Sequence, residues 1–131
     1  MRTSLILLAF VAALGVTPAL AQNCSDSTNQ TAMNECYGQE YETADKLLNA
    51  TYVSLMDKMS ASGKKRLEQI QRSWADYKEG WCKFEASPVE SGTMYPSILA
   101  ECLTRLTNEQ LERLSYQNTC SEDVDCARFA Q

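Results

Sequence analysis

Apolar and aromatic positions recur at steps of three and four along most of this chain, which is the periodicity of an amphipathic α-helix. The first such series consists of Met33, Tyr37, Tyr41, Ala44, Leu48, Tyr52, Leu55 and Met59. It predicts one long helix, and Ser27 with Gln30 three positions later forms a capping box for its start. A polar turn around Ser60, Ser62 and Gly63 is expected to end it.

A second and a third helix follow from the same periodicity. The apolar positions of the second are Leu67, Ile70, Trp74, Tyr77, Trp81 and Phe84. A loop from Ala86 to Pro96 comes next, and the third helix should run from about Ser97 to Gln117. The residues of this helix that are available for the core are Leu99, Cys102, Leu103, Leu106, Leu111 and Leu114. The pattern therefore predicts an all-α fold, an up-down-up three-helix bundle.

Antiparallel geometry gives the first hairpin a register, because residues equally distant from its turn face each other. The pairs are Asp45 with Lys78, Asn49 with Trp74, and Tyr52 with Gln71. We interpret the six residues as internal contacts, with Asp45 and Lys78 as a partly covered ion pair. The alternative is a recognition groove, since aromatic and amide side chains suit the binding of sugars or peptides.

The first residues have the layout of a secretory signal peptide. Arg2 precedes an apolar run from Leu5 to Val16, and small residues lead to a cleavage site after Ala21. The run is too short for a membrane span, so we expect a secreted or periplasmic protein without a transmembrane segment. Residues 22–131 then form a single domain that ends in a cysteine-containing tail.

The exported domain is acidic. The chain has 12 basic residues, of which Arg2 lies in the leader, against 17 acidic ones, so the domain has a net charge of −6. This charge disfavours nucleic acid and anionic membranes as partners and favours a basic protein. The alternative is that acidity only keeps an exported protein in solution.

Six cysteines in an exported domain of this size predict three disulfides. The register of the second hairpin places Cys82 opposite Cys102, Trp81 beside Leu103 and Ile70 beside Leu114. The bundle topology then favours Cys24 with Cys36 at one end and Cys120 with Cys126 at the other. A bond from Cys36 to Cys82 stays open if the register slips.

The chemistry of an enzyme or of a metal site is missing from the sequence. The chain has no histidine and no CxxC pair, so it lacks the usual zinc ligands and a redox dithiol, and we expect no cofactor. Nucleophilic catalysis lacks its base, and the carboxylates fall on polar helix faces where their pKa values stay ordinary. The sequence therefore predicts a protein that is not an enzyme.

Many of these residues together resemble a known family. They are Thr31, Met33, Asn34, Cys36, Tyr41, Ala44, Asp45, Leu48, Asn49, Tyr52, Leu55, Leu67, Gln71, Trp74, Tyr77, Lys78, Cys82, Gly92, Thr93, Pro96 and Cys102. Their spacing is similar to that of the LprI-like domain over about Cys24 to Leu114. The resemblance implies an exported, disulfide-linked helical domain, and the family takes its name from a mycobacterial lipoprotein that inhibits lysozyme. This chain departs from the family pattern in lacking a lipobox, in having Lys78 where arginine is frequent, and in adding Cys120 and Cys126.

The loop between the second and third helices is the candidate binding segment, with Glu85, Glu90, Met94 and Tyr95. The predicted Cys82 to Cys102 bond fixes its base, so it would present an acidic and apolar tip at low entropic cost. Such a tip could enter the cleft of a basic lysozyme. The alternative is that Met94 and Tyr95 fold back to cap the bundle.

Two functions therefore remain open at this stage. One is a lysozyme inhibitor, and the other is a non-catalytic structural or interaction module of the cell envelope that binds another basic protein or none. The sequence leaves the oligomeric state open.

Overall fold

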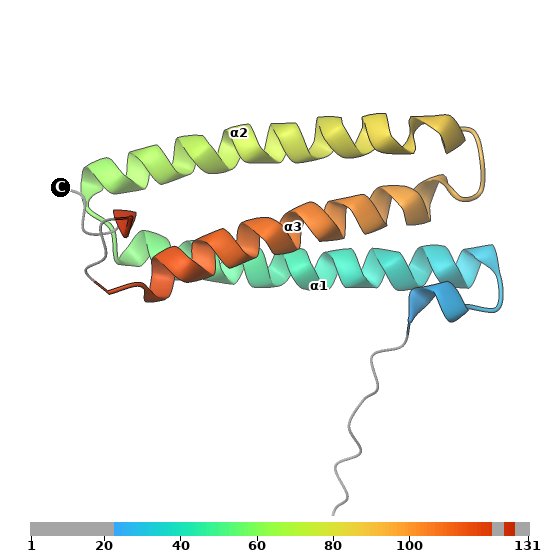
Figure 1. Ribbon diagram of the computed structural model, residues 1–131, viewed down its shortest axis with the longest axis horizontal. Coiled ribbons are helices and arrows are strands. Elements are labelled where there is room, and N and C mark those ends of the chain that lie inside the picture. The colour runs from blue at the N-terminus through green and yellow to red at the C-terminus, as the bar shows by residue number, and fades with distance from the viewer. Residues whose placement is uncertain (1–22, 122–124, 128–131) are drawn as a thin grey trace, which may run out of the picture.

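Three long helices run up, down and up in the computed structural model, which describes residues 23–121 and 125–127 (Figure 1). They are α1 (Gln30–Asp57), α2 (Ala61–Ala86) and α3 (Tyr95–Thr119). A short 3-10 helix, η1 (Cys24–Asp26), precedes them, and η2 (Ser87–Val89) lies between α2 and α3. The all-α bundle predicted from the periodicity is confirmed. The expected signal peptide, residues 1–21, lies outside the described residues.

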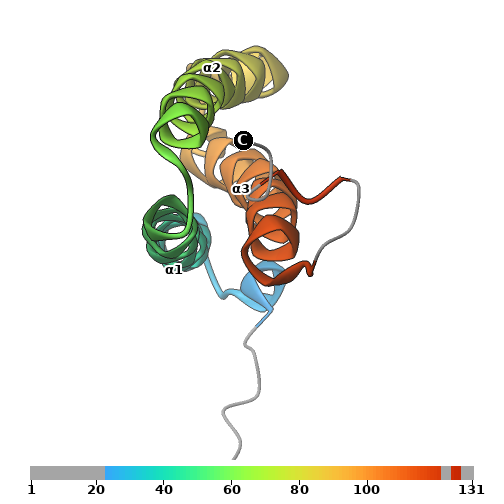
Figure 2. The same cartoon turned by 90° about the vertical axis from the view of Figure 1, so that its left-hand side faces the viewer.

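The three helices do not pack equally. α1 and α3 lie side by side over most of their lengths, α2 rests mainly on α3, and the backbones of α1 and α2 hardly approach each other (Figure 2). Leucines from all three helices form one core cluster, which consists of Leu48, Leu55, Leu67 and Leu114. A second cluster surrounds the Cys82–Cys102 bond. The uneven packing leaves space along the side where α1 and α2 face each other.

The start of α1 differs from the expected capping box. Asn29 is the N-cap, and its Oδ1 accepts a hydrogen bond of 3.0 Å from the Ala32 N–H. Ser27 instead lies in the turn that closes η1, where its backbone N–H donates to the Cys24 carbonyl. Asparagine and serine are about equally good N-caps, which explains why Asn29 can take the place expected for Ser27.

Replacing Asn29 by alanine is expected to lower the free energy of unfolding by about 1 kcal/mol, because the Ala32 N–H loses its acceptor. Ser27→Ala is the matched control and should change stability by less than about 0.5 kcal/mol, as surface substitutions away from such features usually do. Urea unfolding followed by circular dichroism compares the two. A larger loss for Ser27→Ala would contradict the cap assignment.

Two connections are tighter than the sequence suggested. Ser60 caps α2 through a 3.2 Å bond from the Gly63 N–H, so Gly63 is buried inside the first turn of α2 and does not form the turn. Gly63 is suited to this place because a Cβ there would lie 3.1 Å from the Cε of Met59. The second connection is shortened by α3, which starts at Tyr95 and takes Pro96 into its first turn, where proline is favoured.

The disulfides join Cys24 to Cys36, Cys82 to Cys102 and Cys120 to Cys126. These are the pairs that the topology favoured, so the alternative bond from Cys36 to Cys82 does not form. The first bond holds η1 against α1, the second joins α2 to α3, and the third closes the end of the chain beyond α3. The middle bond has the largest structural consequence, because it sets how α2 is rotated.

The buried face of α2 differs from its stripe of apolar residues. The buried residues of α2 are Gly63, Leu67, Lys78, Cys82 and Ala86. Successive residues of an α-helix are turned by about 100°, so the bond that directs Cys82 toward Cys102 turns Trp81 away from that contact. Trp81, which the register placed beside Leu103, is exposed, while Leu103 packs against the cluster around the Cys82–Cys102 bond. Ile70 and Leu114 do line the same apolar pocket, although Ile70 is also exposed.

Candidate functional site

The side of the bundle where α1 and α2 face each other is a groove of about 440 Å³. Its lining consists of Asp45, Leu48, Asn49, Tyr52, Glu68, Gln71, Arg72, Trp74, Ala75 and Lys78. All six residues that the hairpin register paired belong to this lining. The two interpretations of these residues, internal contacts and a recognition groove, therefore concern the same place.

Lys78 lies at the floor of this groove and is only 7% exposed. Its Nζ donates a 3.0 Å hydrogen bond to the Tyr41 hydroxyl and a 3.5 Å bond to Thr107 Oγ1. The same nitrogen lies 5.0 Å from the ring centre of Tyr41 and 4.7 Å from that of Trp74, within cation–π range. Asp45 Oδ1 is 3.8 Å away and partly exposed. One buried ammonium group thus connects all three helices.

Two amide side chains of the groove bond in ways that the register did not foresee. Asn49 Nδ2 donates to Asp45 Oδ2 one turn earlier in α1, at 3.0 Å. Gln71 Oε1 accepts from the buried Gln110 Nε2 of α3. Within the described residues no hydrogen bond joins Gln71 to Tyr52, although both line the groove. The polar groups at the floor are therefore largely engaged with one another.

The candidate loop residues lie at the end of the bundle where α2 passes into α3. Glu90 and Met94 are exposed, whereas Tyr95 is half-buried as the first residue of α3. Met94 thus does not fold back under the bundle, and Tyr95 does so only in part. Glu85 belongs to the last turn of α2 rather than to the loop. The exposed part of this segment is therefore Glu90 to Met94.

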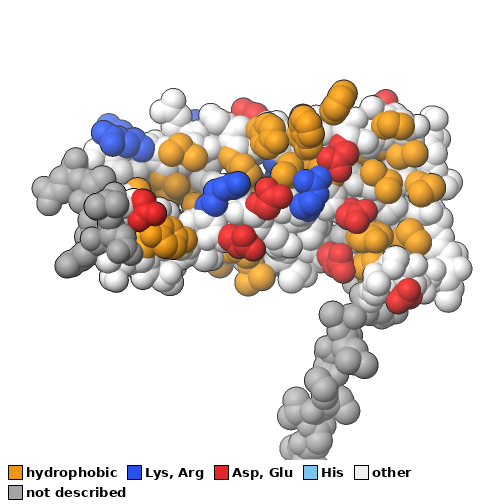
Figure 3. All heavy atoms as spheres, in the orientation of Figure 1, with side chains coloured by type: hydrophobic (Ala, Val, Ile, Leu, Met, Phe, Trp, Pro, Cys, Tyr) orange, Lys and Arg blue, Asp and Glu red, His pale blue; other side chains and the backbone are white. Residues whose placement is uncertain are grey.

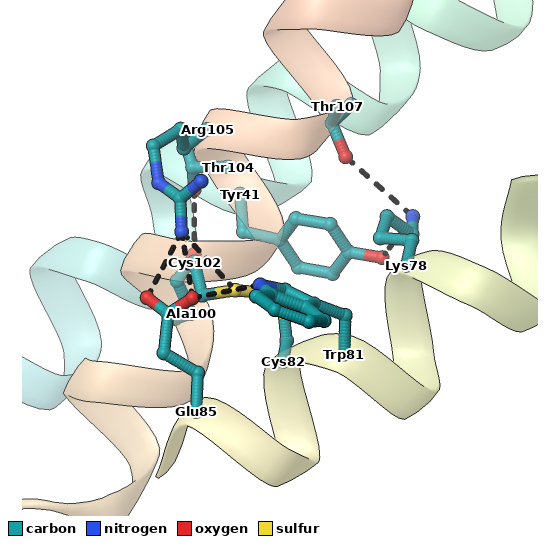
Figure 4. The surroundings of a disulfide bond; sticks show 10 residues. All are labelled: Tyr41, Lys78, Trp81, Cys82, Glu85, Ala100, Cys102, Thr104, Arg105 and Thr107. Carbon is teal, nitrogen blue, oxygen red and sulfur yellow. Dashed lines mark hydrogen bonds and ion pairs between the residues drawn. A yellow bond between two sulfur atoms is a disulfide. The ribbon is translucent and has the colours of Figure 1, made fainter.

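Glu85 is part of a network beside the Cys82–Cys102 bond (Figure 4). Arg105 Nη2 donates to both carboxylate oxygens of Glu85 at 2.9 Å and lies 3.6 Å from Cys102 Sγ. The Trp81 indole N–H also donates to Glu85, at 3.0 Å. The Glu85 carboxylate is thus occupied by α3 and by its own helix.

Three aromatic side chains on α2 form an exposed row, which we call the α2 ridge: Tyr77, Trp81 and Phe84. They are 55%, 43% and 69% exposed. The ring centres of Tyr77 and Trp81 are 6.2 Å apart, and those of Trp81 and Phe84 are 5.8 Å apart. The sequence did not identify this surface, because helical spacing made the three residues look like part of a packed stripe. The adjacent Cys82, which must face α3, was the signal that could have found it.

The titratable groups near the α2 ridge are tied in pairs. The Lys83 ammonium, hydrogen-bonded to Glu79 one turn earlier, lowers the pKa of that carboxyl, and the same bond raises the pKa of Lys83. Elsewhere, burial raises the pKa of Tyr37, with Glu101 and Glu40 contributing in the same direction. At neutral pH these shifts keep Glu79 and Lys83 charged and Tyr37 neutral, so none of them prepares a proton transfer.

One cluster in the described part of the chain has the composition of a metal site: Cys24, Cys36 and Glu40. Both sulfurs are joined in a disulfide, so neither is the thiolate that a metal requires. No described helix is long and apolar enough to cross a bilayer.

The fold and its surfaces define a small helical protein whose three disulfides are typical of the extracytoplasmic space. The chain belongs to the LprI family of lysozyme inhibitors, since the family model described as "Lysozyme inhibitor LprI" matches residues 21–114. It is also 30% identical to an uncharacterized protein of Rhizobium meliloti (strain 1021), over 74% of this chain and 82% of that protein. No solved structure matches.

Proposed function

We propose that this protein is exported, after cleavage near Ala21, and that it binds a basic lysozyme and blocks its cleft without catalysing a reaction. The observation that carries the proposal is the family match, which spans residues 21–114 and so includes all three described helices except the last turns of α3. The family is one of inhibitor proteins, and inhibition by binding needs a complementary surface but no reactive group.

The charge of the domain supports a basic partner. A protein with a net charge of −6 after loss of the leader attracts a cationic protein over about one Debye length, roughly 10 Å at 0.1 M salt. Such attraction raises the association rate more than it raises the intrinsic strength of the final contact. Inhibition that depends on this attraction should weaken as salt rises.

The loop at the α2–α3 end supports a contact with a cleft. The Cys82–Cys102 bond spans a separation of 20 residues and holds both ends of this connection. Glu90 and Met94 project there as one acidic and one apolar exposed side chain. A tip held in place before binding loses little conformational entropy when it is enclosed.

Oxidised protein comprising residues 22–131 is expected to slow the lysis of a peptidoglycan suspension by a basic lysozyme at micromolar concentration. The inhibition should fall when salt is raised from about 50 to about 300 mM, because screening shortens the electrostatic range. Turbidity measures the lysis, and c-, g- and i-type lysozymes are each assayed. Unchanged lysis by all three types would overturn the proposal and favour the envelope interaction module.

A further inference from the structure

The α2 ridge is an unusual surface for a small helical bundle. Tyr77, Trp81 and Phe84 are exposed within two turns of one helix, although three rings of this size would each gain from burial. The space-filling view shows hydrophobic side chains gathered along the edge occupied by α2 (Figure 3). Contiguous exposed apolar patches of this kind mark interaction sites more often than chance exposure.

The ridge is held in place before any partner arrives. The Trp81 ring lies between those of Tyr77 and Phe84, and its indole N–H is hydrogen-bonded to Glu85. Arg105 holds Glu85 from α3, next to the disulfide that joins the two helices (Figure 4). An aromatic anchor fixed in this way costs little conformational entropy on binding.

The charges around the ridge favour a cationic partner. The cations in this region are already neutralised, Lys83 by Glu79 and Arg105 by Glu85. Asp76, adjacent to Tyr77, is exposed and forms no ion pair within the described residues. The uncompensated charge beside the ridge is therefore negative, in agreement with the net charge of the domain.

The shape of the ridge favours a concave partner. Tyr77 and Phe84 are seven positions apart on a convex helix surface, a distance of about 10 Å at 1.5 Å per residue. A row of rings of that length fills a cleft better than it covers a flat surface, and tryptophan and tyrosine are the residues that most often dominate binding energy.

We propose that the α2 ridge, with Trp81 as its central anchor, is the surface that enters the cleft of a basic lysozyme. This inference rests on the proposed inhibitory function and places the main contact on the ridge, with the α2–α3 loop following it at the end of the same helix. The negative charge of Asp76 and of the whole domain steers the basic partner, and the three rings supply the contact that keeps it bound.

The test is a double variant, Tyr77→Ser with Phe84→Ser, which removes the two outer rings and leaves the hydrogen bond from Trp81 to Glu85 in place. Its control is Leu47→Ser with Val53→Ser, which removes two apolar side chains of similar exposure from α1. Calorimetry measures the affinity of each for a basic c-type lysozyme, and circular dichroism verifies that each is folded. The ridge variant should lose about tenfold or more in affinity, whereas the control should stay within about twofold of the unaltered protein.

A charge variant adds a second measurement. Asp76→Lys should lower the association rate several-fold at low salt and change the dissociation rate little, because Asp76 acts at a distance. An association rate unchanged by this substitution would contradict the steering role of Asp76.

The outcomes separate the two proposals. If the unaltered protein binds lysozyme and the ridge variant binds equally well, the assignment to the ridge is wrong and the inhibitory function stands. Equal losses of affinity in the ridge variant and the α1 control would also contradict the assignment to the ridge. The loss would then result from making any exposed apolar surface more polar. If the unaltered protein binds no lysozyme of any type, both proposals fail.

Discussion

Removing the Cys82–Cys102 bond by replacing both residues with alanine is expected to lower the free energy of unfolding by about 3 kcal/mol. This magnitude follows from the chain entropy that a bond across about 20 residues removes from the unfolded state. Alanine is the better replacement because both sulfurs are buried, and serine would add the cost of burying two hydroxyl groups. Guanidinium unfolding followed by circular dichroism measures the change.

The matched control is the double alanine variant at Cys120 and Cys126, which opens a bond with a sequence separation of only 6. The same entropy relation gives about 2 kcal/mol for a loop of this size. A loss at Cys120 and Cys126 that equals or exceeds the loss at Cys82 and Cys102 would contradict the central role of the α2–α3 bond.

The second large effect is expected at Lys78. Replacing it by alanine should lower the free energy of unfolding by about 2 to 3 kcal/mol. The substitution removes the buried stem and the cation between two rings, and it deprives the Tyr41 and Thr107 hydroxyls of a donor. Thr107 is fully buried, so water cannot replace that donor without rearrangement. Thermal and urea unfolding both report the loss.

Lys78→Met separates packing from charge. Methionine keeps most of the stem in place, whereas both variants remove the ammonium group from Asp45, Tyr41 and Thr107. We therefore expect Lys78→Met to cost less than Lys78→Ala by about 1 kcal/mol or more, the scale of one to two buried methylene groups. Equal costs for the two variants would indicate that the charge, not the stem, dominates at this position.

The residues of the groove could be predicted from the sequence, whereas the exposure of the ridge could not, and the difference has a physical reason. The groove residues were found by register, and an antiparallel hairpin with a short turn leaves little freedom in register. Asp45 and Lys78 therefore approach as expected. What register could not supply is the contribution of α3, which places Gln110 against Gln71 and Thr107 against Lys78.

Sequence by itself determined the three helices and their antiparallel order, and it favoured one pairing of the cysteines while leaving a bond from Cys36 to Cys82 open. The helices follow from periodicity, and the favoured pairing follows from the positions of the cysteines along helices of known direction, since sulfurs at opposite ends of a bundle cannot meet; the structure then excluded the bond from Cys36 to Cys82, whose residues lie toward the same end. These are properties of spacing along the chain, and spacing is what a sequence records.

Only the tertiary structure decided which face of α2 is buried. Burial of the apolar stripe from Leu67 to Phe84 and formation of the bond at Cys82 require different faces of α2 to point toward α3. In the C-terminal half of α2, the face that carries Cys82 is the buried one. Lys78, Cys82 and Ala86 consequently face inward there, while the ridge faces outward. A hydrophobic pattern indicates which residues favour burial, but a covalent bond between two helices fixes which of them can be buried together.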